Sequence, residues 1–210
     1  MKPFWRLIPL VFLPLFTACA SPTPTPIKTA DLFTDDFSQD AGNWETFADE
    51  NGAAAAIADG KLALTITRAS TVGFSVAAIN LANFDLTITT AQISGGLANG
   101  YGIIFRYIDE ENFYRFDISG DGLWGVSRRL KDQWLPIAEL TASPAIQTGH
   151  AANTLRLVAR SDQFEFYVNG VLLGQLTDAN LPVGRIGLFA STFDDPNTQV
   201  AFDDLKIVNP

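Results

Sequence analysis

The sequence is poor in the residues that carry most metal and nucleophilic chemistry. Its 210 residues include one cysteine, Cys19, one histidine, His150, and one methionine, Met1. Zinc sites need several cysteine or histidine ligands, so the sequence argues against zinc. It offers no serine–histidine or cysteine–histidine arrangement for catalysis, and a lone thiol cannot form an internal disulfide.

Positive charge is also scarce. Fourteen lysines and arginines stand against 23 aspartates and glutamates, which gives a formal net charge of −9. Nucleic-acid-binding proteins are usually basic where they meet phosphates, so no nucleic acid partner is expected. The net charge does not argue against small uncharged ligands.

The N-terminus lacks an apolar run long enough to span a bilayer. Basic residues begin it, and the apolar run from Leu7 to Phe16 has the length of a signal-peptide core. The run ends in "LFTAC", which resembles a bacterial lipobox, so residues 1–19 are predicted to be a lipoprotein signal peptide with Cys19 as the lipidated residue. The alternative is an ordinary signal peptide cleaved near Ala20. Both place the protein outside the cytoplasm, and the first anchors it to the membrane by lipid.

Proline and threonine alternate in the next segment, residues 20–30, which predicts an extended tether. From Asp31 to Pro210, short apolar runs are separated by glycine, asparagine and aspartate. Such runs predict strands, and Asn169-Gly170 is typical of a two-residue hairpin turn. We therefore expect residues 31–210 to form one all-β domain, a two-sheet antiparallel β-sandwich or jelly roll.

The segment "YGIIFRYIDEENFYRFDISGDGLWGVSRR" (residues 101–129) reads as three consecutive strands joined by tight turns. If the second turn sets Asp117 opposite Trp124, side-chain alternation predicts two faces. The predicted core face carries Ile103, Phe105, Tyr107, Tyr114, Phe116, Ile118 and Leu123. The other predicted face carries the candidate ligand-binding residues Arg106, Arg115, Asp117, Trp124 and Arg128.

Arginine can hydrogen-bond sugar hydroxyls or a carboxylate, and tryptophan offers a flat apolar platform to a sugar ring. The face could equally be a solvated surface held by an arginine–aspartate network. Trp134 is a second possible platform, with capping of the core as its alternative.

Several stretches resemble the concanavalin A-like lectin/glucanase superfamily, above all laminin-G-like and 3-keto-disaccharide hydrolase-type domains. These are "GYGIIFRYIDEENFYRFDI", "FEFYVNGVLLGQLTD", "GRIGLFAS" and "VAFDDLKI". The resemblance implies a β-sandwich whose ligands often lie on a concave sheet. It also implies carbohydrate binding, or hydrolysis in some members. A glucanase of that superfamily carries its carboxylates as E-x-D-x-x-E on one strand, and the sequence has no such pattern.

Four aspartates near the two ends of the domain could meet if the terminal strands pair. They are Asp35, Asp36, Asp203 and Asp204. Oxygen-rich clusters bind Ca²⁺, so these aspartates are candidate ligands of a structural calcium; the alternative is that they serve turns and strand ends, which aspartate also suits. No other cofactor is expected. The sequence thus predicts a lipid-anchored, non-catalytic glycan-binding domain; a glycoside hydrolase and a cell-envelope protein-interaction domain are the alternatives.

Overall fold

The computed structural model describes Met1 and residues 31–210. The predicted signal peptide, Cys19 and the tether lie outside the described residues. In the part that is described, no helix is long and apolar enough to cross a membrane.

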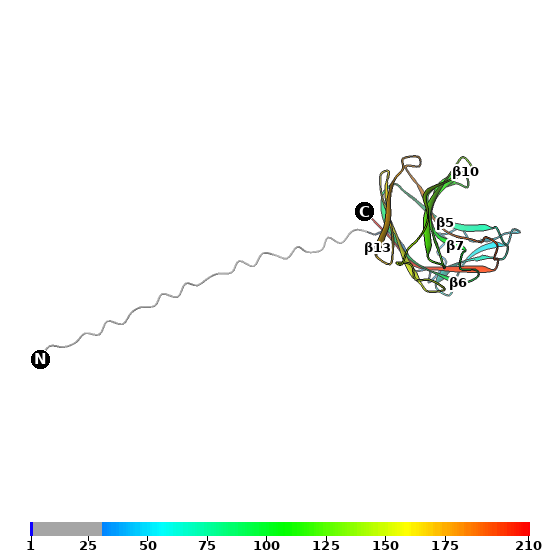
Figure 1. Ribbon diagram of the computed structural model, residues 1–210, viewed down its shortest axis with the longest axis horizontal. Coiled ribbons are helices and arrows are strands. Elements are labelled where there is room, and N and C mark those ends of the chain that lie inside the picture. The colour runs from blue at the N-terminus through cyan, green and yellow to red at the C-terminus, as the bar shows by residue number, and fades with distance from the viewer. Residues whose placement is uncertain (2–30) are drawn as a thin grey trace.

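The domain consists of β-strands arranged in two antiparallel sheets (Figure 1). One sheet has the order β13-β12-β11-β6-β15-β4-β3-β2, with β1 also paired to β15, and the other has the order β10-β9-β8-β7-β14-β5. The strands are β1 (Asp31–Asp35), β2 (Phe47–Ala48), β3 (Ala53–Ala58), β4 (Lys61–Ile66), β5 (Val72–Leu81), β6 (Phe84–Ser94), β7 (Gly100–Asp109), β8 (Asn112–Ser119), β9 (Leu123–Leu130), β10 (Gln133–Ala142), β11 (Asn153–Arg160), β12 (Gln163–Val168), β13 (Val171–Thr177), β14 (Gly184–Ser191) and β15 (Thr198–Val208). The all-β sandwich expected from the sequence is confirmed.

Turn chemistry explains the hairpins. Asn169 and Gly170 join β12 to β13 with φ values of 50° and 80°. Asp59 and Gly60 join β3 to β4 with φ values of 52° and 70°. Two successive positive φ angles define the type I′ turn, whose twist matches that of the strands it connects. The hairpin predicted at Asn169-Gly170 is therefore confirmed.

The core between the two sheets is rich in phenylalanine. The ring of Phe105 in β7 stacks on Tyr114 with centroids 5.0 Å apart, and it meets the edge of Phe164 from the opposite sheet at 5.2 Å. Phe116 and Phe166 make a similar contact across the sandwich at 5.1 Å. These inter-sheet ring contacts confirm that Phe105 and Phe116 point into the core, as alternation predicts.

The second hairpin of the 101–129 segment has a different register from the one expected. Ile118, not Asp117, lies opposite Trp124, and Asp117 lies opposite Gly125. The turn holds an odd number of residues between Ser119 and Leu123 and ends at Gly122, whose φ is +95°. A shift of one residue moves every side chain of a strand to the other face. The predicted faces of β9 are therefore wrong: Trp124 and Arg128 turn inward, whereas Leu123 turns outward.

A bulge in β7 corrects a second expectation. Tyr114 pairs with Phe105 and Arg115 with Ile104, but the register shifts before Asp109, and Arg106 adopts a φ of 55°. The bulge turns Arg106 inward, where it is fully buried, and sends Tyr107 to the outer side of the sheet. Arg106 therefore leaves the face on which it was predicted, and Ile104 is the residue of β7 that lies opposite Arg115.

Candidate functional site

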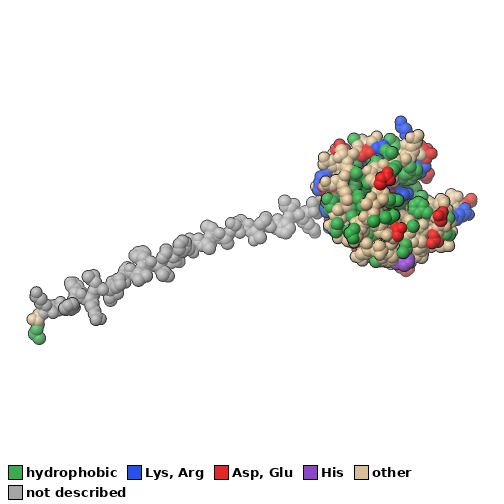
Figure 2. All heavy atoms as spheres, in the orientation of Figure 1, with side chains coloured by type: hydrophobic (Ala, Val, Ile, Leu, Met, Phe, Trp, Pro, Cys, Tyr) green, Lys and Arg blue, Asp and Glu red, His purple; other side chains and the backbone are tan. Residues whose placement is uncertain are grey.

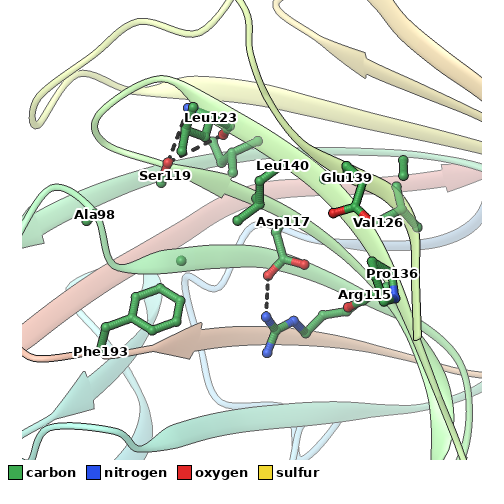
Figure 3. Close-up of a pocket in the computed structure, with 15 residues that line it drawn as sticks. Ala98, Arg115, Asp117, Ser119, Leu123, Val126, Pro136, Glu139, Leu140 and Phe193 are labelled. Carbon is green, nitrogen blue, oxygen red and sulfur yellow. Dashed lines mark hydrogen bonds and ion pairs between the residues drawn. The ribbon is translucent and has the colours of Figure 1, made fainter. Parts of the chain in front are cut away.

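The outer face of the six-stranded sheet carries a pocket of about 240 Å³. Arg115 and Asp117 from β8 lie at its base, and β10 and the β14–β15 loop form its sides (Figure 3). In the space-filling view the domain is notched on the right, beneath the β10 hairpin (Figure 2). The pocket faces away from the inter-sheet core.

Two glycines create the space above Asp117. Its cross-strand neighbours are Gly102 on β7 and Gly125 on β9, neither of which has a side chain. A Cβ atom on Gly125 would come within 3.1 Å of both the Ala138 carbonyl oxygen and a Leu140 methyl carbon. β10 therefore passes close over Gly125, and larger side chains there would fill the pocket.

Asp117 and Arg115 form an ion pair at the base of the pocket. The Arg115 Nη2 and Asp117 Oδ1 atoms are 2.7 Å apart, and the two side chains are 16% and 10% exposed. Burial raises the pKa of Asp117 because it disfavours the charged form, and the Arg115 guanidinium partly offsets this effect. The pair thus supplies both donors and acceptors in a site that is largely shielded from solvent.

Aromatic rings fix the orientation of the Arg115 guanidinium. Its Cζ atom lies 4.5 Å from the ring centroid of Phe189 and 5.0 Å from that of Trp134. Such cation–π contacts hold the planar group in place. Among the described residues, neither Arg115 Nε nor the nearby Ser127 Oγ has a hydrogen-bond partner. Ser127 pairs with Arg115 across β8 and β9, so these two unpartnered groups belong to neighbouring residues of the sheet beneath the pocket.

The two sides of the pocket come from distant parts of the chain. Leu140 and Glu139 belong to β10, whose register against β9 shifts twice, and the Leu140 side chain is 61% exposed. Phe193 follows β14 and is 53% exposed. Its loop is anchored by Asn99, whose Oδ1 accepts a hydrogen bond from the Phe193 amide and whose Nδ2 donates one to the Asp195 carbonyl oxygen. An apolar rim therefore surrounds a polar base.

Of the five residues predicted to share a face, only Arg115 and Asp117 come together. Arg106 is buried at one end of the core. Its Nη2 donates to the Ser161 carbonyl oxygen at 2.9 Å, and its Nη1 donates to the carbonyls of Leu81 and Pro182. Its guanidinium also lies against the rings of two buried phenylalanines of the core.

Trp124 and Arg128 lie on the inner side of β9. Trp124 packs against the core beside Gly174 of β13. Arg128 forms an ion pair with Asp178, which also accepts a 2.6 Å hydrogen bond from the Tyr114 hydroxyl. These contacts tie the loop after β13 to the six-stranded sheet. Trp124 and Arg128 therefore stay outside the pocket that holds Arg115 and Asp117.

The four aspartates considered for calcium are only partly gathered. β1 and β15 do pair, with Asp35 opposite Leu205, and Asp35, Asp36 and Asp204 line a shallow hollow beside them. Asp35 accepts hydrogen bonds from the Phe37 amide and Trp44 Nε1, whereas Asp203 forms an ion pair with Lys61 instead. Within the described residues, no group of three or more carboxylate, histidine or cysteine side chains is placed to hold a metal ion. Calcium stays a prediction.

Sequence reasoning missed most of the pocket. Phe193, Leu140, Glu139 and Ser127 were not candidates, because their approach to Asp117 depends on how remote segments fold over the sheet. One signal was available: glycines recur in the strands on either side of Asp117, and a glycine inside a strand often marks a close approach or a bulge.

Comparisons with known proteins connect the chain to others by structure only. No family model matches the sequence, and no curated protein matches it. Among solved structures, the carbohydrate binding module CBM66 from Bacillus subtilis is similar with a TM-score of 0.64 at 17% identity, over 80% of this chain and 96% of that one.

Two further structures show the same architecture. A Bacillus subtilis protein of unknown function with a galectin-like fold has a TM-score of 0.65 at 12% identity, over 87% of this chain and 97% of that one. A Bacteroides ovatus GH43B protein, described with a xyloglucan locus, has a TM-score of 0.62 at 18% identity, over 89% of this chain but only 41% of that one. At such identities the likeness concerns the fold alone. The chain therefore has the galectin-like, concanavalin A-like two-sheet β-sandwich fold, as its sequence resemblance implied.

Proposed function

We propose that this chain binds a glycan and holds a sugar ring in the pocket around Arg115 and Asp117. The observation that carries the proposal is a monosaccharide-sized cavity with an ion pair at its base and apolar side chains at its rim. Sugar recognition commonly needs this combination, because hydroxyl groups require directional hydrogen bonds while the C–H faces of the ring pack on apolar surfaces.

Three features of the pocket support a polar but uncharged ligand. The Arg115 charge is already balanced by Asp117, Glu139 lies at the same pocket, and the chain as a whole is acidic. An anionic ligand would therefore meet net negative charge. Arg115 and Ser127 both line the pocket, and Ser127 Oγ and Arg115 Nε lack protein partners among the described residues.

The proposal is tested by screening the purified domain on a glycan array and measuring the affinity of the best hits by calorimetry. Phe193→Ala removes one apolar side of the pocket and should weaken binding about tenfold, which corresponds to about 1.4 kcal/mol. Val171→Ala is a matched control, because Val171 is 51% exposed on β13 of the other sheet. Equal weakening by both substitutions, or no glycan bound by the wild type, would refute the proposal.

A glycoside hydrolase is the second candidate, and two carboxylates in one pocket favour it. Burial raises the pKa of Asp117, as expected of a proton donor to a leaving oxygen, while Glu139 could activate a water molecule. The ion pair with Arg115 counts against this role because it stabilises the ionised form of Asp117. Release of reducing sugar from the array hits, lost in both Asp117→Asn and Glu139→Gln, would establish hydrolysis; binding without release would exclude it.

We also propose that the domain is held outside the cytoplasm by a lipid on Cys19. The support is the apolar run of signal-peptide length that ends at Phe16, shortly before the only cysteine of the sequence. Mass spectrometry of the mature protein should find a lipidated N-terminal Cys19, and Cys19→Ser should release the protein from membranes. An unmodified N-terminus near Ala20 would favour the ordinary signal peptide instead.

A further inference from the structure

Beyond the pocket, the same outer face carries four aromatic side chains that touch one another. We call Phe74, Tyr107, Phe113 and Trp134 the aromatic platform. Phe113 is its centre: its ring centroid lies 6.1 Å from that of Phe74, 5.9 Å from that of Tyr107 and 5.5 Å from that of Trp134. These residues come from β5, β7, β8 and β10, so the platform extends across the sheet.

Two rings of the platform are accessible and two support them from below. Phe113 and Tyr107 are buried, whereas Phe74 is half-buried and Trp134 is 46% exposed. Capping of the core was one of two interpretations of Trp134 from the sequence, but the side chain lies outside the core, against Phe113 and Arg115. A tryptophan held rigidly by neighbouring rings with half its surface exposed loses little conformational entropy when it binds a ligand.

Arg115 connects the platform to the pocket. Its guanidinium bonds Asp117 at the base of the pocket, and the same group stacks on Trp134 of the platform. A ligand that leaves the pocket past Arg115 therefore meets the platform directly. The two features form one continuous surface.

The two arginines beside the platform are already paired with carboxylates. Arg129 pairs with Asp132 and stacks on Trp134, and Arg185 pairs with Glu45 at 2.7 Å and stacks on Tyr107. Each pair presents donors and acceptors together. This arrangement suits hydroxyl groups and gives no net attraction to carboxylates or sulfates.

We propose that the aromatic platform is a second sugar subsite, so that the chain binds an uncharged oligosaccharide spanning the pocket and the platform rather than a single terminal sugar. This inference rests on the proposed glycan-binding function. The pocket would hold one sugar unit through Arg115 and Asp117, and Phe74 and Trp134 would stack on the next units.

The experiment measures affinity as a function of ligand length. The probes are laminari-oligosaccharides, xylo-oligosaccharides and xyloglucan oligosaccharides of increasing length with their monosaccharides, titrated by calorimetry and by NMR for the weakest binders. For the wild type, affinity should rise at least tenfold from the monosaccharide to the longer members of the preferred series. Phe74→Ala should remove most of that rise and leave monosaccharide affinity unchanged, because Phe74 does not line the pocket. Trp134→Ala should remove it as well.

The control substitution is Tyr167→Ala. Tyr167 stacks under Arg156 at 4.9 Å on the outer face of the other sheet, so it reproduces an exposed aromatic–arginine contact far from the platform. It should preserve the full length dependence. Affinity that does not rise with length, or that rises equally in Phe74→Ala, would overturn the second subsite and leave the pocket proposal intact. No binding of any probe by the wild type would overturn both proposals for these neutral glycans.

Discussion

Arg106 and Arg115 allow a sharp test of how this fold divides its arginines between stability and binding. Arg106 is fully buried and has no carboxylate partner among residues 31–210, and its guanidinium donates to backbone carbonyls from three separate segments. Arg106→Met keeps most of the apolar stem but leaves those carbonyls without a donor. Each buried unsatisfied carbonyl costs about 1–3 kcal/mol. Removing the buried charge also removes its desolvation penalty, which stabilises the folded state by several kcal/mol.

The balance of these effects gives an expected loss of about 3 kcal/mol in the free energy of unfolding for Arg106→Met. That is a large share of the roughly 5–15 kcal/mol typical of a domain. Urea denaturation measures it, with an unchanged m-value as the check on two-state behaviour. Glycan affinity of the protein that remains folded should match the wild type, because Arg106 points into the core.

Arg115→Lys is the matched substitution in the pocket. It keeps a positive charge beside Asp117 but loses the planar group stacked between Phe189 and Trp134. We expect a smaller loss of stability than for Arg106→Met, because lysine keeps a positive charge beside Asp117, and a clear loss of glycan affinity. The reasoning fails if Arg106→Met is as stable as the wild type, since the desolvation cost would then outweigh the carbonyl contacts. It also fails if Arg106→Met weakens binding while Arg115→Lys does not.

Four further predictions concern the pocket and its surroundings. Because burial raises the pKa of Asp117, the folded state binds this proton more readily than the unfolded state, so the contribution of Asp117 to stability is present at low pH and is lost as pH rises through its folded pKa. The free energy of unfolding of the wild type minus that of Asp117→Asn, measured in urea, should therefore fall with rising pH; a rise would mean that the arginine dominates. Gly125→Val should abolish glycan binding in calorimetry while the far-UV spectrum is kept. Gly102→Ala should instead cost about 2–3 kcal/mol in urea denaturation, because its Cβ would lie 2.1 Å from the Phe116 carbonyl oxygen. Trp124→Ala should lower the free energy of unfolding by about 3 kcal/mol and leave glycan affinity unchanged, since Trp124 packs on the core. Weaker glycan binding by folded Trp124→Ala would show that Trp124 belongs to the binding site.

The sequence was sufficient to predict the sandwich because its signals are local. Alternation of apolar residues along β8 placed Tyr114, Phe116 and Ile118 in the core and Arg115 and Asp117 outside it, as the structure has them. The turn at Asn169-Gly170 is likewise set by its own two residues.

The site was harder to predict because register depends on loop length. Five residues separate the last paired residues of the β8–β9 hairpin, Ile118 and Trp124, whereas a hairpin with Asp117 opposite Trp124 would have an even number there. This shift of the register by one residue places Trp124 and Arg128 on the face of the sheet opposite to Asp117. The bulge at Arg106 has no comparable sequence signal, since a positive φ at arginine is stabilised only by its tertiary contacts with carbonyls of remote segments.

The edge strand β10 allows one side of the pocket to open locally. β10 ends the six-stranded sheet, so its backbone pairs with β9 alone, and that pairing is interrupted twice near Leu140. Strands held on one side open locally at a lower free energy than strands in the middle of a sheet. The β10 side of the pocket can therefore detach from β9 while β7 and β8 stay folded. A bound ligand that contacts Leu140 stabilises the closed form. Hydrogen exchange at the β10 amides should therefore slow when the pocket is occupied.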